Sequence, residues 1–84
     1  MKYEVIWKST AIAELAEIWN RADDRAAMTE AADELDESLQ SQPFEVGESR
    51  FDNFRIAFQE PIGIIFEVIE SKQQVFVLRV WAVD

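Results

Sequence analysis

The chain has 84 residues and a formal charge of −9, from 8 basic and 17 acidic side chains. It contains no cysteine and no histidine, which excludes disulfides, thiol chemistry, a Ser-His-Asp triad and imidazole ligands for a metal. A surface this acidic repels the phosphates of nucleic acids and favours basic partners. We therefore expect a single cytoplasmic domain over residues 1–84, with no cofactor, no membrane contact and no direct binding of nucleic acid.

The first expected element is a strand over residues 2–8, where apolar and polar positions alternate. Its apolar face consists of Tyr3, Val5 and Trp7. Ser9 and Thr10 follow and are predicted to cap a helix, because a hydroxyl oxygen can accept a hydrogen bond from a free N–H of the first turn.

Two helices are predicted next, over residues 11–22 and 25–41. In the first, apolar residues at helical spacing predict a buried stripe of Ile12, Leu15, Ala16 and Trp19. The second is rich in alanine, which has high helix propensity, and its predicted stripe is Met28, Ala31 or Ala32, Leu35 and Leu39. Asp23 and Asp24 separate the helices and are expected to cap the second, and so short a break predicts an antiparallel helical hairpin.

A loop over residues 43–52 leads into three apolar runs, which are separated by turn signals at residues 60–61 and 71–72. The run at 54–58 alternates and predicts a strand whose buried face is Phe54, Ile56 and Phe58. The runs at 62–69 and 75–83 are apolar on both faces, which is typical of interior strands. One of these two is expected to be the central strand of the sheet.

Strict alternation divides the last run into two faces. One face is Val75, Val77, Trp81 and Val83, and the other is Phe76, Leu78, Val80 and Ala82. The resulting fold class is α+β with the order β-α-α-β-β-β. The helical hairpin is expected to pack on one face of a small four-stranded twisted sheet, because nothing else in the chain can cover it.

The order of elements is distinctive together with a set of short motifs. They are the run ELAEIW at 14–19, Pro43 with Gly47, Arg50, FRI at 54–56, IIFEV at 64–68 and VFVLRV at 75–80. In this combination the chain resembles the RelE/ParE superfamily, the toxins of bacterial type II toxin–antitoxin systems. The resemblance implies a RelE/ParE-like fold, a plasmid-stabilisation role, and an antitoxin that wraps the toxin with a helix and an extended segment. RelE-like members cut mRNA in the ribosomal A site, and ParE-like members poison DNA gyrase.

The chain departs from the nuclease branch at three places. An arginine usual near the start of the strand at 62–69 is replaced by Gly63, and a second lysine usual in the strand at 54–58 by Ala57, which leaves Arg55 as the cation there. The basic, aromatic-bearing tail that usually follows the last strand corresponds to residues 81–84, which contain no cation. RNA cleavage needs cations on the transition-state phosphate and groups that carry protons. We therefore predict no enzymatic activity, the alternative being an mRNA endoribonuclease.

Three arginines are the candidate catalytic residues of that alternative: Arg50, Arg55 and Arg79. Arg55, Arg79 and Trp81 are the candidate partner-binding residues. Arg55 and Arg79 could converge on one sheet face and bind a carboxylate or phosphate through their planar forks. The other interpretation, which we favour, is that each arginine pairs with a nearby acid such as Glu67 or Asp52.

Trp81 could form an aromatic platform with Phe76 and Trp7, although core packing is the commoner use of such residues. Four carboxylates line one face of the second helix: Glu30, Asp33, Glu34 and Glu37. They could hold Mg²⁺ or Ca²⁺ or attract a basic antitoxin, but we interpret them as a solvated outer face and predict no metal site. Gly63 is interpreted as a bulge or a close approach of backbone at the start of its strand.

The leading hypothesis is a toxin-like component of a type II toxin–antitoxin system that acts by protein binding. Its partners would be a cognate antitoxin, basic in charge, and DNA gyrase as cellular target. One alternative is a divergent ribosome-dependent mRNA interferase. Another is an inactive orphan domain that is retained as an interaction module, whose exposed sheet edge pairs with a partner strand.

Overall fold

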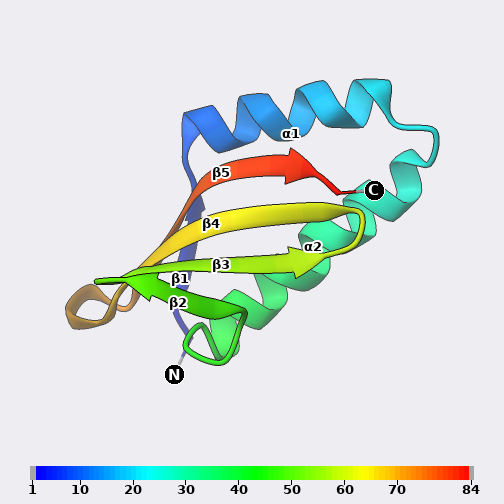
Figure 1. Ribbon diagram of the computed structural model, residues 1–84. Helices are drawn as coiled ribbons and strands as arrows, with labels where there is room; N and C mark the ends of the chain where they lie inside the picture. Colours follow the sequence, from blue (N-terminus) through cyan, green and yellow to red (C-terminus); the bar gives the residue numbers. More distant parts are fainter. Residues whose placement is uncertain (1, 84) are drawn as a thin grey trace.

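A computed structural model describes residues 2–83 (Figure 1). Met1 and Asp84, which the expected domain also includes, lie outside the described residues. The elements in chain order are β1 (Glu4–Trp7), α1 (Ser9–Arg21), α2 (Arg25–Ser41), β2 (Glu48–Phe51), β3 (Phe54–Gln59), β4 (Ile62–Ile69), the short 3₁₀ helix η1 (Glu70–Lys72) and β5 (Gln74–Ala82). The fold class is α+β, as predicted. None of the helices in this part of the chain has the length and apolar character to cross a membrane.

The strands form one mixed sheet in the order β1-β5-β4-β3-β2. β1 pairs with β5 in parallel, and the other pairs are antiparallel. β4 is therefore the central strand, which confirms that one of the last two apolar runs occupies this place.

Within residues 2–83 the sheet has five strands, and the prediction of four was wrong. The additional strand, β2, lies in the segment that was expected to be a loop. All of its residues are exposed, so the strand has no buried face that apolar alternation could reveal. The strand forms through backbone pairing with β3, in which Glu48 is opposite Ile56 and Ser49 is opposite Arg55.

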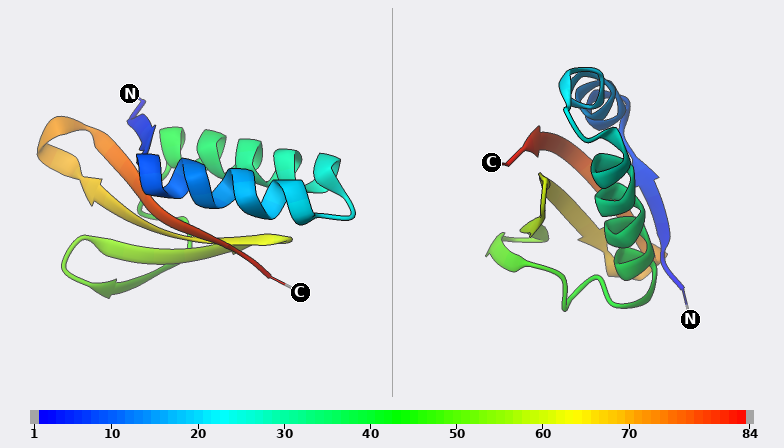
Figure 2. Two further views of the ribbon diagram at one scale, coloured as in Figure 1. Left: turned by 90° about the horizontal axis from the view of Figure 1, so that it is seen from above. Right: turned by 90° about the vertical axis from the view of Figure 1, so that its right-hand side faces the viewer.

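Both helices lie on the same side of the sheet (Figure 2), with α1 packed on β5 and α2 packed on β1, β3 and β4. The helical hairpin and its cover of one sheet face were both predicted. Asp24 caps α2 as expected, because its Oδ1 accepts a hydrogen bond from the Ala27 N–H at 3.0 Å. The cap predicted for α1 does not form: Lys8 holds the N-cap position without a side-chain hydrogen bond.

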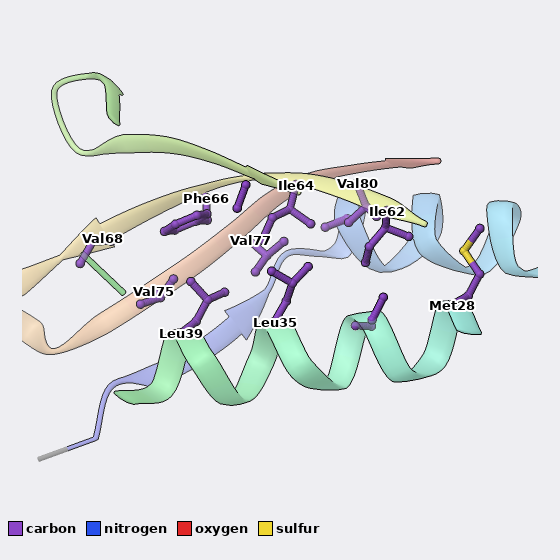
Figure 3. Close-up of a cluster of buried hydrophobic side chains, with 14 residues drawn as sticks. Met28, Leu35, Leu39, Ile62, Ile64, Phe66, Val68, Val75, Val77 and Val80 are labelled. Atoms are coloured by element: carbon purple, nitrogen blue, oxygen red, sulfur yellow. The ribbon is translucent and has the colours of Figure 1, made fainter. Parts of the chain in front are cut away.

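The hydrophobic core lies between the helices and the inner face of the sheet (Figure 3). α2 buries its whole predicted stripe, which is Met28, Ala31, Ala32, Leu35 and Leu39. β4 contributes Ile62, Ile64, Phe66 and Val68, each no more than 2% exposed. The buried stripe predicted for α2 and the interior position predicted for the strand at 62–69 are both confirmed.

α1 turns only part of its predicted stripe to the core, since Leu15 packs there but Ile12 and Trp19 do not. Ala11 is fully buried, and Leu15 and Ile18 pack against the core, whereas Ile12 is 55% and Trp19 is 38% exposed. α1 has two apolar stripes offset by one position, and helical periodicity alone does not decide which of them meets the sheet.

β3 also faces the opposite way from the prediction. Its predicted buried face of Phe54, Ile56 and Phe58 lies on the outer side of the sheet, because these residues pair with Glu67, Ile65 and Gly63 of β4. Ala57 is 2% exposed and Phe58 is 58% exposed, the reverse of the prediction. Ala57 pairs with buried Ile64, so it shares the inner face, which α2 approaches closely. A methyl group fits in that narrow space, and the larger Phe58 is left on the outer face.

A β-bulge in β5 explains why strict alternation failed there. Ile65 pairs with Arg79, but Phe66 pairs with Val77, so Leu78 is an extra residue in the ladder. The alternation shifts by one position after the bulge, and the buried residues are Val75, Val77 and Val80. Trp81, which was predicted to share a face with Val75 and Val77, therefore lies on the outer face.

Candidate functional site

The outer, helix-free face of the sheet carries two of the predicted partner-binding residues. Arg79 is opposite Ile65, and Trp81 is opposite Gly63, which is in turn opposite Phe58 on β3. Because directly paired residues point to the same face of a sheet, all five residues belong to the outer face. The bulge described above sets this orientation for Arg79 and Trp81.

The three residues Phe58, Gly63 and Trp81 form what we call the outer aromatic row. A Cβ atom added at Gly63 would lie 2.7–2.8 Å from three atoms of the Trp81 indole. The indole therefore lies directly on the backbone of Gly63, which confirms the close approach predicted there. The Phe58 ring meets Trp81 edge to face, with centroids 6.0 Å apart and planes at 82°. The row places an exposed aromatic surface on the side of the sheet that has no helix.

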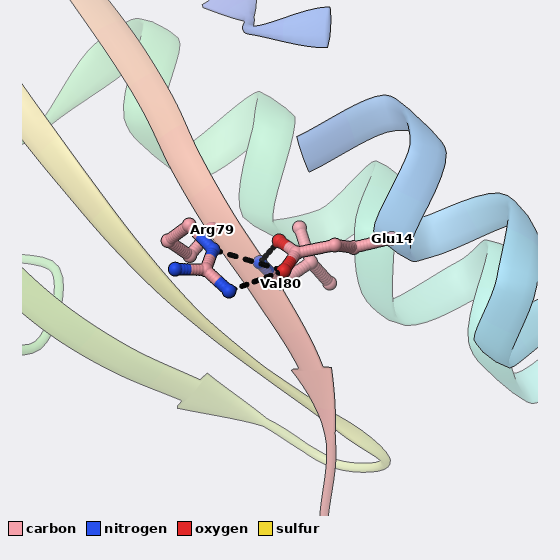
Figure 4. A network of polar contacts seen from close by, with 3 residues as sticks. All are labelled: Glu14, Arg79 and Val80. Carbon is pink, nitrogen blue, oxygen red and sulfur yellow. Dashed lines mark hydrogen bonds and ion pairs between the residues drawn. The ribbon is translucent and has the colours of Figure 1, made fainter. Parts of the chain in front are cut away.

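Glu14 on α1 closes the neighbouring edge of β5 (Figure 4). The pairing of β1 with β5 ends at Trp7 and Val77, so the backbone of β5 beyond that point has no strand beside it on this edge. Glu14 Oε1 accepts a hydrogen bond from the Val80 N–H at 2.9 Å. Its Oε2 accepts from Arg79 Nε at 2.9 Å and from Arg79 Nη2 at 2.7 Å. One carboxylate thus joins α1 to β5 and accepts the hydrogen bond of the Val80 N–H on the open edge.

The same contacts shift the titration of both side chains. Hydrogen bonds from the Arg79 guanidinium and then from the Val80 N–H lower the pKa of Glu14, because they stabilise its charged form. The Glu14 carboxylate raises the pKa of Arg79. The charge of Arg79 is therefore matched by an acid within the molecule, and its fork is already occupied by a carboxylate.

Arg55 lies on the other face of the sheet. It is opposite Phe66, which is buried against the helices. Its Nε donates to the Val46 carbonyl and its Nη2 to the Gly47 carbonyl, both at 3.1 Å. Arg55 thus holds the loop before β2 against β3, and it does not converge with Arg79.

Arg50 is exposed and sits at an irregularity in the pairing of β2 with β3. The ion pairs expected with Glu67 or Asp52 do not form: between residues 2 and 83 the ion pairs are Arg79–Glu14 and Arg21–Glu17. The structure therefore does not gather the three candidate arginines into one cluster.

The predicted aromatic platform of Trp81, Phe76 and Trp7 is not assembled. Trp7 is opposite buried Val77 on the inner face, and its Nε1 donates to Asp36 Oδ1 at 2.8 Å. Phe76 pairs with Ile6, and its ring lies under Lys8 Nζ at 4.8 Å. The aromatic partner of Trp81 is Phe58, a residue that alternation predicted to be buried.

The acidic face of α2 is exposed at all four predicted positions: Glu30, Asp33, Glu34 and Glu37. Within residues 2–83 no three acidic side chains come close enough together to hold a metal ion. The arrangement is that of a solvated helix face with a strong negative charge.

Solved structures identify the class of fold. No family model matches the sequence, and no curated protein matches it. Structures of RelE and ParE toxins superpose on nearly the whole chain, and the chain has the RelE/ParE-like toxin fold.

Three of these structures show the extent of the likeness. A chain of the RelBE2 toxin–antitoxin complex from Mycobacterium tuberculosis gives a TM-score of 0.80 at 16% identity, covering 98% of this chain and 92% of that one. A chain of the chromosomal ParDE system from P. aeruginosa gives 0.73 at 20% identity, covering 98% and 97%. The isolated RelE toxin from E. coli gives 0.68 at 19% identity, covering 98% and 85%.

Proposed function

We propose that this chain is the toxin-fold component of a type II toxin–antitoxin pair and that it acts by binding proteins, without cleaving RNA. The fold supports the first part, because its structural neighbours include toxins solved together with antitoxins, as in RelBE2 and ParDE. The distribution of cations supports the second part and is the observation that carries the proposal. Arg79 is held by Glu14, and Arg55 lies on the opposite face of the sheet.

A phosphate in the transition state of RNA cleavage needs cations that are free to approach it. On the outer face, Arg79 would first have to release Glu14, and it would then stand beside an aromatic row instead of a second cation. With a formal charge of −9 the chain also repels the RNA backbone as a whole. Both features favour a protein as the target.

The proposed partner is a basic antitoxin that covers the outer aromatic row. Exposed aromatic residues are common anchors of protein interfaces, and Phe58 is 58% exposed next to Trp81. The acidic face of α2 would speed the encounter with a basic protein by long-range attraction. For the cellular target, DNA gyrase is the first candidate, as implied by the resemblance to ParE-like members.

The test is growth of cells that express this chain, with and without the protein encoded by the adjacent reading frame. We expect growth arrest from the chain alone, rescue by the neighbouring protein, and a stable complex of the two after purification. Phe58→Ser should weaken the complex, whereas Phe44→Ser, which removes an aromatic residue of similar exposure (49%) outside the row, should not. Normal growth together with no complex would contradict the proposal and favour an inactive orphan domain.

A further inference from the structure

A groove at one end of the molecule is not part of the outer face. Here the turn between α1 and α2, the turn between β3 and β4, and the end of β5 border an open groove with a volume of about 650 Å³. The apolar part of its lining includes Ile18, Ala22, Met28, Pro61 and Val83. We call this feature the end groove. Its volume falls within the range of roughly 300–1,000 Å³ that is typical of ligand pockets.

The walls of the end groove are fixed by hydrogen bonds between its segments. The Val83 N–H donates to the Pro61 carbonyl at 2.8 Å, which ties the end of β5 to the β3–β4 turn. Asp24 Oδ1 accepts from the Ala27 N–H, which fixes the start of α2 beside the groove. The groove is thus formed before any partner binds, and a ligand would not have to order its walls.

The rim of the end groove is negatively charged. Asp23, Asp24 and Glu60 line it, and all three are exposed. Among the lining residues that the structure describes, Arg21 is the one cation, and its Nη2 lies 3.4 Å from Glu17 outside the groove. An apolar floor inside an acidic rim excludes anions and complements a ligand that has an apolar side chain flanked by positive charges.

We propose that the end groove receives an apolar anchor residue from a lysine- or arginine-rich amphipathic segment of a protein partner. This inference rests on the proposed function, in which the partner is the antitoxin, and it assigns a second contact region beyond the outer aromatic row. The groove is large enough for an apolar side chain, so the anchor enters while its charged neighbours face the acidic rim. A nucleic acid does not fit this description, because its phosphates would meet the acidic rim.

The experiment uses the full chain and a designed amphipathic peptide of about 15 residues with leucine on one face and lysine on the other. Binding is followed by NMR through the methyl groups of Met28 and Val83, and the same titration gives the Kd. Two control peptides replace lysine with glutamate or leucine with serine. We expect saturable shifts of the groove methyls with the lysine–leucine peptide and none with either control.

Variants of the chain locate the site. Ala27→Trp places an indole in the groove and should abolish binding. Asp23→Lys on the rim should weaken binding on the order of fivefold, whereas Glu34→Lys, which makes the same change of charge on the outer face of α2, should alter it by less than about twofold. If Ala27→Trp does not fold, as judged by circular dichroism, Val83→Asp serves the same purpose at the open end of the groove.

Two results would overturn the inference: equal losses for Asp23→Lys and Glu34→Lys, or unchanged affinity in a folded Ala27→Trp. The experiments distinguish a wrong assignment of the end groove from a wrong proposed function. If the neighbouring protein rescues growth equally well for wild type and Ala27→Trp, the function holds and the groove assignment is wrong. If the peptide binds the groove but the chain never arrests growth, the groove holds and the proposed function is wrong.

Discussion

At the scale of single residues, two small details shape the outer face: the missing side chain of Gly63 and the carboxylate of Glu14. Gly63 leaves the space in which the Trp81 indole lies. Glu14 fixes Arg79 and the Val80 N–H, and so holds the end of β5 beside α1. Neither residue stands out in the sequence as a functional residue, yet both decide where Trp81 and Arg79 lie.

Gly63→Ala is predicted to destabilise the fold by roughly 1–3 kcal/mol, because its methyl group overlaps the indole and forces it away. Urea unfolding of the wild type and the variant measures this loss. The matched test is the same substitution in a Trp81→Ala background, where the methyl meets no ring and the cost of Gly63→Ala should largely disappear. Equal costs in the two backgrounds would mean that the indole does not rest on Gly63.

Glu14 should make folding stability depend on pH. Its pKa is lower in the folded chain than in the unfolded one, so its contribution is complete above the ordinary carboxyl range of about 4.3 and is lost as pH falls through the folded-state value. Glu14→Gln removes this contribution. The stability difference between wild type and Glu14→Gln should therefore be largest near neutral pH and shrink as pH falls below the ordinary carboxyl pKa of about 4.3.

Urea unfolding at a series of pH values measures this difference. Glu17→Gln is the control on the same helix, because the exposed pair of Glu17 with Arg21 has little effect on stability. A Glu14→Gln difference that does not change with pH would rule out a charge-dependent contact with Arg79.

At the scale of elements, the sequence predicted those that have one clear periodicity and failed where two patterns compete. α2 has a single apolar stripe and β4 is apolar on both faces, and the buried helix face and the interior strand that these patterns predict were both placed correctly. α1 has two apolar stripes, and the docking of the helix on β5 selects between them. In β3, alternation placed Phe58 on the buried face, but Ala57 is the residue that shares the inner face with Ile64.

The candidate site was also predicted only in part, because local patterns do not reveal a bulge or the packing of distant elements. Arg79 and Trp81 share a face, but the bulge at Leu78 decides which face, and alternation does not reveal a bulge. Glu14 and Arg79 are 65 positions apart, so their contact depends on how α1 packs. The place of Phe58 beside Gly63 could have been predicted from the sequence. A two-residue turn at 60–61 puts Phe58 opposite Gly63 once β3 and β4 pair.

Neighbouring residues of β3 provide a test of this face assignment. Ala57→Lys buries an unpaired charge under α2 and should destabilise the fold by roughly 3 kcal/mol or prevent folding. Phe58→Lys keeps its charge in solvent and should cost about 1 kcal/mol, the size of the lost contact with Trp81. Thermal unfolding of both variants compares them directly. A larger loss of stability for Phe58→Lys than for Ala57→Lys would contradict this assignment of the faces of β3.

At the scale of the whole molecule, charge and shape work together. The chain carries a formal charge of −9, one sheet face is covered by helices, and the other exposes an aromatic row. Such a surface attracts basic proteins over a distance and offers apolar contacts at close range. It is poorly suited to hold a polyanion.

The complex with a basic partner is therefore predicted to form more slowly as salt rises. The Debye length falls from about 10 Å at 0.1 M to about 3 Å at 1 M salt, which screens the attraction between exposed charges. Association rates measured by stopped-flow fluorescence should fall steeply over this range, while dissociation rates change little. Association that does not respond to salt would show that the acidic surface plays no part in recognition.

The central claim is that this toxin fold acts on proteins and does not cut RNA. The most direct measurement is primer extension on mRNA bound to ribosomes, after incubation with purified chain, alongside the variants Arg55→Ala and Arg79→Ala. We predict that the mRNA stays intact with the wild type and with both variants. Cleavage by the wild type that is lost in Arg55→Ala or Arg79→Ala would contradict the account and identify the chain as a ribosome-dependent endoribonuclease.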